Sequence, residues 1–360
     1  MRRYKTYING EWFEGTSGIV LRSVDPSNNK ELGEIVQNSK EDVEYAIESA
    51  SRSFYKTREW RDLDVQQRSD KLLKIADMIE SEIDEIAKTE SMDNGKPLRE
   101  AQADVDDAVH CFRYYAGLIH TPSGQTYNVN SNFGNMHSYT VKEPVGVCAL
   151  ITPWNFPFLM SVWKIAPALA AGNSIIFKPS SETVLSALKL FEILDKCDLP
   201  KGTANLVIGS GSTVGNLLAE SKKVDMITFT GSTSVGQGIM RAAAGNVKKI
   251  GLELGGKSPN IVFADTDIDK TVEWVMMGIF LNQGEVCCAG SRLIVEKSIK
   301  DKFLKKLVER TDKLTLGAPL DNPDMGPLIS KKHMQDVLGY IEKGKAEGAK
   351  LLCGGYKCTD

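Results

Sequence analysis

Several features that mark specialised classes of protein are missing from this sequence. No apolar stretch approaches the roughly 20 residues that a membrane-spanning helix needs, and the run over residues 274–281 is far shorter. The N-terminus carries two arginines but no apolar segment of the kind found in a secretory signal. Internal repeats and low-complexity tracts are absent too. We therefore expect a cytoplasmic protein without a membrane partner.

An excess of charge of one sign is also missing. The 44 basic and 47 acidic residues give a net charge of -3. Binding to nucleic acid requires a basic surface, so nucleic acid is not an expected partner and a small molecule is. The 42% hydrophobic and 25% charged residues are typical of a globular protein, and 360 residues suffice for two domains.

The seven cysteines show neither metal-ligand spacing nor the pattern of a disulfide framework. We therefore expect reduced thiols and no metal site. Free cysteine is usually a small buried hydrophobe, which is the expectation for Cys148 and Cys197. The adjacent pair Cys287 and Cys288 differs because it follows an apolar helical segment and precedes a glycine.

Hydrophobic periodicity predicts an α/β fold. Residues 40–116 show helical spacing, and residues 121–140 form a polar, partly alternating stretch that indicates an extended excursion. After Pro144, short β-rich runs alternate with helices of about 10–15 residues, the pattern of a doubly wound parallel sheet. These runs cover residues 145–151, 174–177, 204–208, 226–229 and 250–254. A second strand and helix series covers residues 258–263, 268–282, 292–295 and 300–313.

Glycine-marked junctions after strands suggest a dinucleotide site. Residues 209–215 have one residue more than the GxGxxG spacing, which makes this motif weak by itself. Gly231 and Ser232 begin a helix, where the serine can cap the helix, bind phosphate or do both. Lys178 ends another strand, where it could bond a ribose or a phosphate or be an ordinary solvated lysine.

Three residues have the chemistry for acyl transfer. Asn155 lies between Pro153 and Pro157, which fix the backbone, so it is either a preorganised amide donor for an oxyanion or a local turn residue. A thiolate at Cys287, with its pKa lowered by a backbone-rich turn or a cationic cofactor ring, would be a nucleophile. Glu253 follows an apolar strand; it is either a partly desolvated base with a raised pKa or a salt-bridge partner of a nearby lysine.

Together and in this order, these motifs resemble the aldehyde dehydrogenase superfamily over essentially the whole chain, most closely its hydrolytic branch of betaine aldehyde and general aldehyde dehydrogenases. The resemblance implies that Cys287 is the nucleophile, Glu253 the general base and Asn155 part of the oxyanion hole. It implies that NAD contacts Thr152, Trp154, Lys178, Ser181, Gly211, Gly215, Gly231, Ser232 and Leu254. It also implies a substrate tunnel lined by Phe156, Met160 and Trp163.

The activity implied is oxidation of an aldehyde to a carboxylic acid through a cysteine thiohemiacetal and a thioester. The alternatives are a relative that passes the acyl group to coenzyme A, against which Glu253 argues, and a cofactor-binding fragment without turnover. The resemblance also implies a cofactor domain over residues 1–121 and 144–255, an arm over residues 122–143 that joins subunits of a homo-oligomer in the full-length form, and a catalytic domain over residues 256–360.

Three departures from the family pattern modify these expectations. Relatives continue beyond the equivalent of Asp360, so we expect the catalytic domain to be incomplete here. Ser181 occupies a position where many NAD-preferring relatives have glutamate, which leaves room for the 2′-phosphate of NADP, although NAD remains favoured. Glu285 replaces the commoner glutamine, and an anion pointing at Cys287 would oppose thiolate formation.

Overall fold

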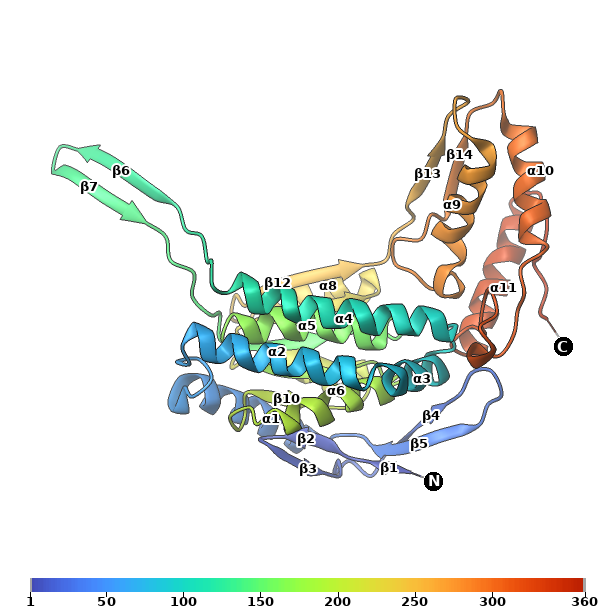
Figure 1. Cartoon of the computed structure of the whole chain (residues 1–360). Helices are drawn as coiled ribbons and strands as arrows, with labels where there is room; N and C mark the ends of the chain where they lie inside the picture. The colour runs from blue at the N-terminus through green and yellow to red at the C-terminus, as the bar shows by residue number, and fades with distance from the viewer. Residues whose placement is uncertain (1, 359–360) are drawn as a thin grey trace.

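A seven-stranded sheet in the order β12-β11-β8-β9-β10-β2-β3 forms the centre of the structure (Figure 1). The computed structural model describes residues 2–358. The parallel part of the sheet consists of β8 (Val147–Ile151), β9 (Ser174–Lys178), β10 (Ala204–Leu206), β11 (Met226–Gly231) and β12 (Lys249–Leu254). The doubly wound parallel sheet predicted from the sequence is therefore confirmed. Antiparallel β2 (Thr6–Ile8) and β3 (Glu11–Phe13) extend one edge.

Helices cover both faces of the sheet because its strands are apolar on both sides. In β8, Cys148 and Leu150 face one core and Ala149 the other. The first core is closed by α2 (Val65–Ser81), α3 (Ile83–Asn94), α4 (Leu98–Leu118), α5 (Pro157–Ala170) and α6 (Leu185–Lys196). The second is closed by α1 (Lys40–Arg52), α7 (Asn216–Glu220) and α8 (Thr233–Ala243).

The chain order of the strands reverses at β8, which pairs with β9 on one side and β11 on the other. In open α/β sheets, ligands bind outside the carboxyl ends of the strands at such a switch point. The carboxyl ends of β8, β9, β10, β11 and β12 and the segments that follow them carry the residues expected to contact NAD. Two short π-helices, η1 (Ser53–Thr57) and η2 (Gly211–Gly215), add to the layer around the second core.

Residues 2–358 form three smaller sheets besides the central one, two of them before residue 140. β1 (Arg3–Tyr4), β4 (Val20–Val24) and β5 (Glu31–Val36) form a three-stranded sheet. The extended excursion predicted for residues 121–140 is an antiparallel hairpin of β6 (Thr126–Ser131) and β7 (Gly134–Tyr139), which projects far from the body in Figure 1. Its apolar side chains are exposed, and Phe133 at the tip is 97% exposed.

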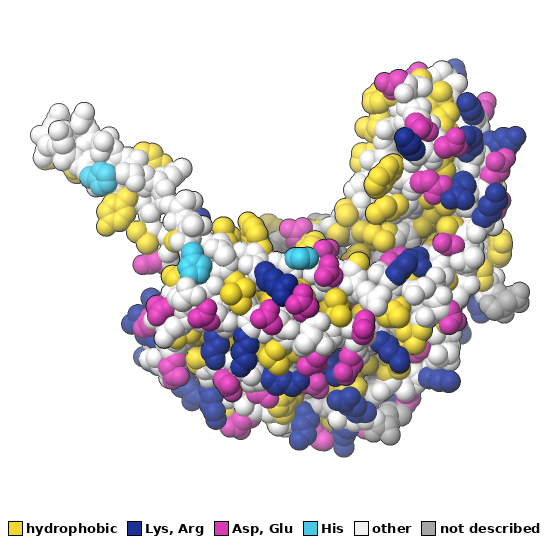
Figure 2. Space-filling model, viewed as in Figure 1, with side chains coloured by type: hydrophobic (Ala, Val, Ile, Leu, Met, Phe, Trp, Pro, Cys, Tyr) yellow, Lys and Arg dark blue, Asp and Glu magenta, His cyan; other side chains and the backbone are white. Residues whose placement is uncertain are grey.

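The C-terminal part stands apart from the central sheet in Figure 1. Parallel strands β13 (Pro259–Val262) and β14 (Arg292–Val295) pack with α9 (Ile268–Phe280) and α10 (Lys300–Thr311) around a small core that includes Val272 and Phe303. Two 3-10 helices, η3 (Leu281–Gly284) and η4 (Pro319–Asp321), and α11 (Lys331–Ala346) complete it. Figure 2 shows hydrophobic side chains on the side of this part that faces the hairpin.

The loop before α11 is locked against the turn between α3 and α4. A Cβ added to Gly326 would lie 1.8 Å from the carbonyl oxygen of Gly95. Gly95 itself has φ +98°, a conformation that side chains rarely adopt. The close approach of these two backbones fixes residues 326–330 relative to the junction of α3 and α4.

Replacing Gly326 by alanine should lower the free energy of unfolding by about 1–3 kcal/mol, because the backbone of Gly95 cannot yield as a side chain would. Denaturant unfolding of the parent and the variant measures this difference. Gly339→Ala is the matched control: it lies in α11 with nothing within 4 Å of the added Cβ, so its stability should stay the same or rise slightly. Equal behaviour of the two variants would contradict the proposed lock.

Among residues 2–358, no helix combines the length and the apolar character that crossing a bilayer requires. All seven cysteines are free. Cys148 and Cys197 are buried as predicted, whereas Cys287 and Cys288 are exposed. Within the same residues, no group of three or more His, Cys, Asp or Glu side chains is arranged to hold a metal ion.

Candidate active site

Three segments that are distant in the sequence meet at the turn that carries Cys287. The N–H of Gly256 donates to the carbonyl oxygen of Cys287 at 3.0 Å, which brings the end of β12 and Glu253 to this turn. Asn155 Nδ2 donates to the carbonyl oxygen of Glu285 at 2.6 Å. The structure therefore gathers the segments of all three expected catalytic residues.

The backbone of the nucleophile turn, which we define as residues 281–288, is strained. Asn282 and Gln283 have φ of 49° and 58°, a left-handed conformation that is uncommon outside glycine. Hydrogen bonds hold it in place: Asn282 N–H donates to Glu100 Oε2 at 2.8 Å, and Asn282 Nδ2 donates to the carbonyl oxygen of Asn155 at 2.8 Å. Strain that persists because the surroundings over-determine it is typical of functional sites.

Cys287 is exposed in this turn, beside the also exposed Cys288. The expectation of a lowered thiol pKa is wrong for the protein on its own. Partial burial of the thiol is the main cause that raises the pKa of Cys287, and the neighbouring Cys288 raises it further. Backbone N–H groups of the turn act in the opposite direction but are weaker. The protein alone therefore keeps this cysteine as a neutral thiol at neutral pH.

Glu253 lies within β12, inside the strand predicted over residues 250–254, and pairs with Thr230 of β11. Its residue is exposed, so the partial desolvation expected from the sequence is wrong. The alternative of a salt bridge to Lys249 or Lys257 is also wrong, because none of the ion pairs of residues 2–358 includes Glu253. The carboxylate of Glu253 is thus accessible to water.

Lys164 on α5 is a neighbour of this carboxylate that sequence reasoning missed. Its Nζ donates to Thr228 Oγ1 at 2.9 Å, and burial lowers its pKa to about 8 while the charge of Glu253 opposes that shift. The available signal was a single charged residue in the otherwise apolar helix α5. A buried lysine that has a shifted pKa and lies beside a carboxylate is typical of functional sites.

The loop that carries Asn155 is held by the junction of α3 and α4, also missed from the sequence. Asn94 Nδ2 donates to the carbonyl oxygen of Trp154 at 2.9 Å. Glu90 accepts the N–H of Phe158 at 3.2 Å, and Lys96 Nζ lies 4.3 Å from the centre of the Phe156 ring. Lys96 is buried and paired with Asp104 and Glu90, as a buried charge requires.

Asn155 itself is more than a local turn residue. Its Nδ2 reaches across the chain to Glu285 rather than back to its own loop. A side-chain amide nitrogen carries two N–H donors, so one remains after this bond is made. Anchoring one donor to the backbone of the nucleophile turn fixes the direction of the other.

The residues expected to contact the cofactor lie along the carboxyl edge of the sheet. Lys178 is only 4% exposed, so the alternative of a solvated lysine is wrong; its Nζ donates to the carbonyl oxygen of Pro179 at 3.0 Å, and burial lowers its pKa to about 8. Thr152 N–H donates to the carbonyl oxygen of Lys178 at 3.1 Å, and Thr152 Oγ1 is buried without a partner. Ser181 Oγ donates to the carbonyl oxygen of Gly209 at 2.9 Å.

The glycine-marked junctions frame the same edge. Gly231 ends β11, and Ser232 caps α8 by accepting the N–H of Val235 at 3.4 Å. Gly211 and Gly215 bound η2; a Cβ on Gly215 would come within 3.9 Å of Lys178 Cε. Leu254 ends β12 and contacts the position of Gly236 in α8.

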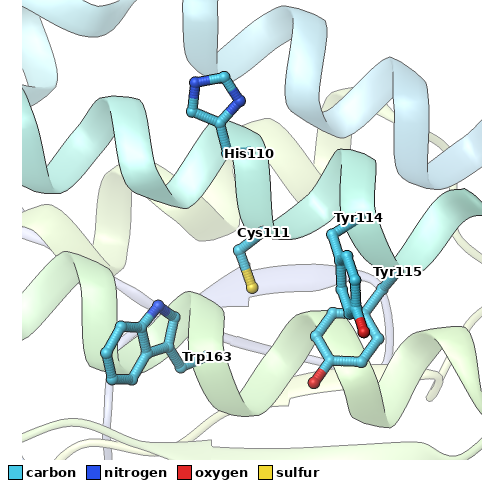
Figure 3. A pocket seen from close by; sticks show the side chains of 5 residues that line it. All are labelled: His110, Cys111, Tyr114, Tyr115 and Trp163. Carbon is cyan, nitrogen blue, oxygen red and sulfur yellow. The ribbon is translucent and has the colours of Figure 1, made fainter. Parts of the chain in front are cut away.

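Of the three expected tunnel residues, Trp163 lines a hollow on the surface. Trp163, which is exposed, lines an open hollow of about 460 Å³ between α4 and α5 with His110, Cys111, Tyr114 and Tyr115 (Figure 3). Phe156 instead packs near Lys96. Met160 lies one helical turn before Trp163 on α5 but is not among the residues that line the hollow.

Comparison with known proteins gives the family of this chain. The family model described as "Aldehyde dehydrogenase family" matches residues 12–360. Betaine aldehyde dehydrogenase of Bacillus subtilis is 46% identical over 355 residues, covering 98% of this chain and 72% of the relative. Mitochondrial aldehyde dehydrogenase of Homo sapiens is 41% identical over 358 residues, covering 98% of this chain and 68% of the relative.

Solved structures agree with the sequence comparison. The structure of betaine aldehyde dehydrogenase from Staphylococcus aureus in complex with NAD+ superposes with a TM-score of 0.95 and 42% identity, covering 99% of this chain and 70% of that chain. The apo structure of a G234S mutant of the same enzyme gives a TM-score of 0.95 and 41% identity, covering 99% of this chain and 71% of that chain. The chain therefore belongs to the aldehyde dehydrogenase family.

Proposed function

We propose that this member of the aldehyde dehydrogenase family uses Cys287 as a nucleophile to oxidise an aldehyde to a carboxylic acid with NAD. The observation that carries the proposal is the meeting of three segments at the nucleophile turn, through the bonds from Gly256 to Cys287 and from Asn155 to Glu285. The relatives named above support it, since they are aldehyde dehydrogenases and one was crystallised with NAD+.

The protein residues divide the reaction between them. Cys287, as a thiolate, attacks the aldehyde carbon and forms a thiohemiacetal. The free donor of the Asn155 amide and the backbone N–H of Cys287 stabilise the oxyanion, and loss of hydride leaves a thioester on Cys287. Glu253, which is exposed, removes a proton from water, and the hydroxide releases the acid from the thioester.

The carboxyl edge of the sheet fits a dinucleotide. The capped start of α8 offers backbone N–H groups to a phosphate, and Lys178 offers a buried ammonium to a ribose or phosphate. The unpartnered Thr152 Oγ1 and the open space beside Gly211 leave polar atoms and room for a ligand. When bound there, NAD accepts the hydride.

The proposal is tested by measuring NADH formation by the purified 360-residue protein with a panel of aldehydes, alongside NAD binding. We expect sustained NADH formation with release of the carboxylic acid. Dependence of product release on coenzyme A would favour the acyl-transferring alternative. NAD binding without NADH formation would contradict the proposed turnover and favour the alternative of a cofactor-binding chain.

Ser181 should set the choice between NAD and NADP. Its hydroxyl adds no negative charge where a glutamate would repel a 2′-phosphate, so Ser181→Glu should lower kcat/KM with NADP relative to NAD by about tenfold or more. Ser181→Gln has a similar size without the charge and should change the ratio much less. Initial rates with both cofactors measure the effect, and an equal shift in the two variants would show that charge is not the cause.

We also propose the division into a cofactor domain over residues 1–121 and 144–255, an arm over residues 122–143 and a catalytic domain over residues 256–360. The polar contacts between the first and the last include Arg99 N–H, which donates to Asn322 Oδ1 at 2.7 Å. The arm exposes Tyr127, Val129 and Met136 on a two-stranded hairpin that pairs with no other strand of residues 2–358, which supports a role in homo-oligomer formation.

A further inference from the structure

We propose that Glu285 is a positioning residue that acts in its uncharged form, tying the nucleophile turn and Asn155 to the loop of residues 326–330 and to α11. This inference rests on the proposed roles of Cys287 and Asn155 and adds a residue to them.

The contacts of Glu285 join three parts of the structure. Its carbonyl oxygen accepts Asn155 Nδ2 at 2.6 Å and Asn282 Nδ2 at 3.4 Å, which orients the oxyanion amide. Its side chain is 1% exposed, and Oε1 accepts the N–H of Ile329 at 3.0 Å. His333 Nε2 of α11 lies 3.6 Å from the same oxygen. One residue thus connects the nucleophile turn to the C-terminal helix through both its backbone and its side chain.

The partners of this carboxyl are themselves fixed. The loop that presents Ile329 N–H is locked because Gly326 packs against the backbone of Gly95. Ser330 caps α11 by accepting the N–H of His333 at 3.2 Å. The His333 ring in turn lies 5.2 Å from the Trp154 ring, edge to face. The Glu285 side chain is therefore held in one orientation as a hydrogen-bond acceptor, unlike the mobile side chain of a surface glutamate.

The surroundings favour the protonated carboxyl. Burial raises the pKa of Glu285 to about 8, against weaker opposing effects of Ile329 N–H and Lys96. His333 supplies no counter-charge at neutral pH, because burial lowers its pKa as well. Oε2 is buried without a partner, so an ionised carboxylate would have an unsatisfied oxygen. The titratable and charged groups that face Glu285 or its partners are Lys96, Glu100, Cys287, Cys288, His333 and Asp336.

A neutral Glu285 also explains how a glutamate at this position is compatible with a thiolate at Cys287. An ionised glutamate in the nucleophile turn would oppose formation of the Cys287 thiolate. While its proton stays on, Glu285 adds no anion beside the thiol. Above about pH 8 it should ionise, and the new buried negative charge should disfavour the Cys287 thiolate.

The test compares the parent with Glu285→Gln and Glu285→Leu by the rate at which iodoacetamide alkylates Cys287 between pH 6 and pH 10. Tandem mass spectrometry that fragments the peptide containing Cys287 and Cys288 assigns the label to one of these adjacent thiols and separates Cys287 from the other six cysteines. Glutamine keeps an acceptor for Ile329 N–H and cannot ionise. We expect the parent and Glu285→Gln to agree near pH 6.5 and the Gln variant to react at least about threefold faster near pH 9.5.

Glu285→Leu removes the acceptor and keeps the bulk. Its alkylation rate should differ from the parent at every pH, and the Gln variant should restore the parental rate at neutral pH. Superimposable profiles of the parent and Gln variant would overturn the inference, as would a Leu variant that behaves like the parent. A general loss of stability would not yield a difference confined to alkaline pH, and circular dichroism at each pH identifies unfolded protein.

Alkylation requires no turnover, so the inference and the proposed function can fail separately. The pH profile of kcat for NADH formation adds the link to catalysis: it should fall above about pH 8 in the parent and not in Glu285→Gln. The predicted alkylation difference without NADH formation by the parent would retain the role of Glu285 at the thiol and contradict the proposed function. NADH formation by the parent, with alkylation and kcat profiles that are identical in the parent and Glu285→Gln, would retain the proposed function and contradict the role of Glu285.

Discussion

Cys287→Ala should reduce NADH formation by about 10⁴-fold or more, because the proposed thiohemiacetal and thioester both form on the Cys287 sulfur. The alanine variant should still fold and bind NAD. Cys287 is exposed, and its hydrogen bond with Gly256 is made by the backbone carbonyl oxygen, which the substitution keeps. Steady-state assays with an aldehyde that the parent oxidises measure the loss.

Cys288→Ala is the matched control for this result. The two cysteines are adjacent, equally free and both exposed, so nonspecific reagents do not distinguish them. Removing Cys288 should leave activity within about an order of magnitude of the parent and remove one cause that raises the Cys287 pKa. Inactive Cys288→Ala with active Cys287→Ala would exchange the proposed roles of the two thiols.

The central sheet could be predicted because its strands carry a strong local signal. Buried parallel strands are continuous apolar runs, and β8, β9 and β11 stand out between helices for that reason. Boundaries were less accurate where the apolar pattern and the hydrogen-bonded strand differ. The run predicted over residues 204–208, for example, includes Val207 and Ile208, which lie beyond β10 (Ala204–Leu206), because their side chains stay buried after the strand ends.

The candidate site was predictable in its residue types and not in its surroundings. The proposed nucleophile Cys287 and the proposed oxyanion amide of Asn155 were visible as motifs, but the contacts that hold them come from elsewhere in the chain. Glu90 and Lys96 lie in the α3–α4 region and support the Asn155 loop only after folding. Ile329 and His333 surround Glu285 for the same reason. Burial and pKa depend on such long-range packing, which no local pattern encodes.

Glu253→Gln should separate the two halves of the proposed reaction. Glutamine keeps the size of the side chain but cannot accept a proton from water, so hydrolysis of the thioester should slow by about 10²–10⁴-fold. Acylation depends on Cys287 and Asn155 and should proceed at close to the parental rate. Rapid mixing with NAD and aldehyde should then show a burst of NADH equal to one per active site, followed by very slow turnover.

Because Glu253 is accessible to solvent, its substitution should change catalysis without changing the structure, which is not expected for a buried base. The residue is exposed and has no ion-pair partner among residues 2–358, so the substitution breaks no structural contact of the carboxylate. Glu253 acts on the buried Lys164 through its charge, so removing that charge should lower the pKa of Lys164 further. Glu220→Gln, at an exposed glutamate that ends α7, serves as the control and should leave both phases unchanged. Steady turnover at the parental rate in Glu253→Gln would exclude the deacylation role, and loss of the burst itself would move Glu253 to the step that activates the thiol.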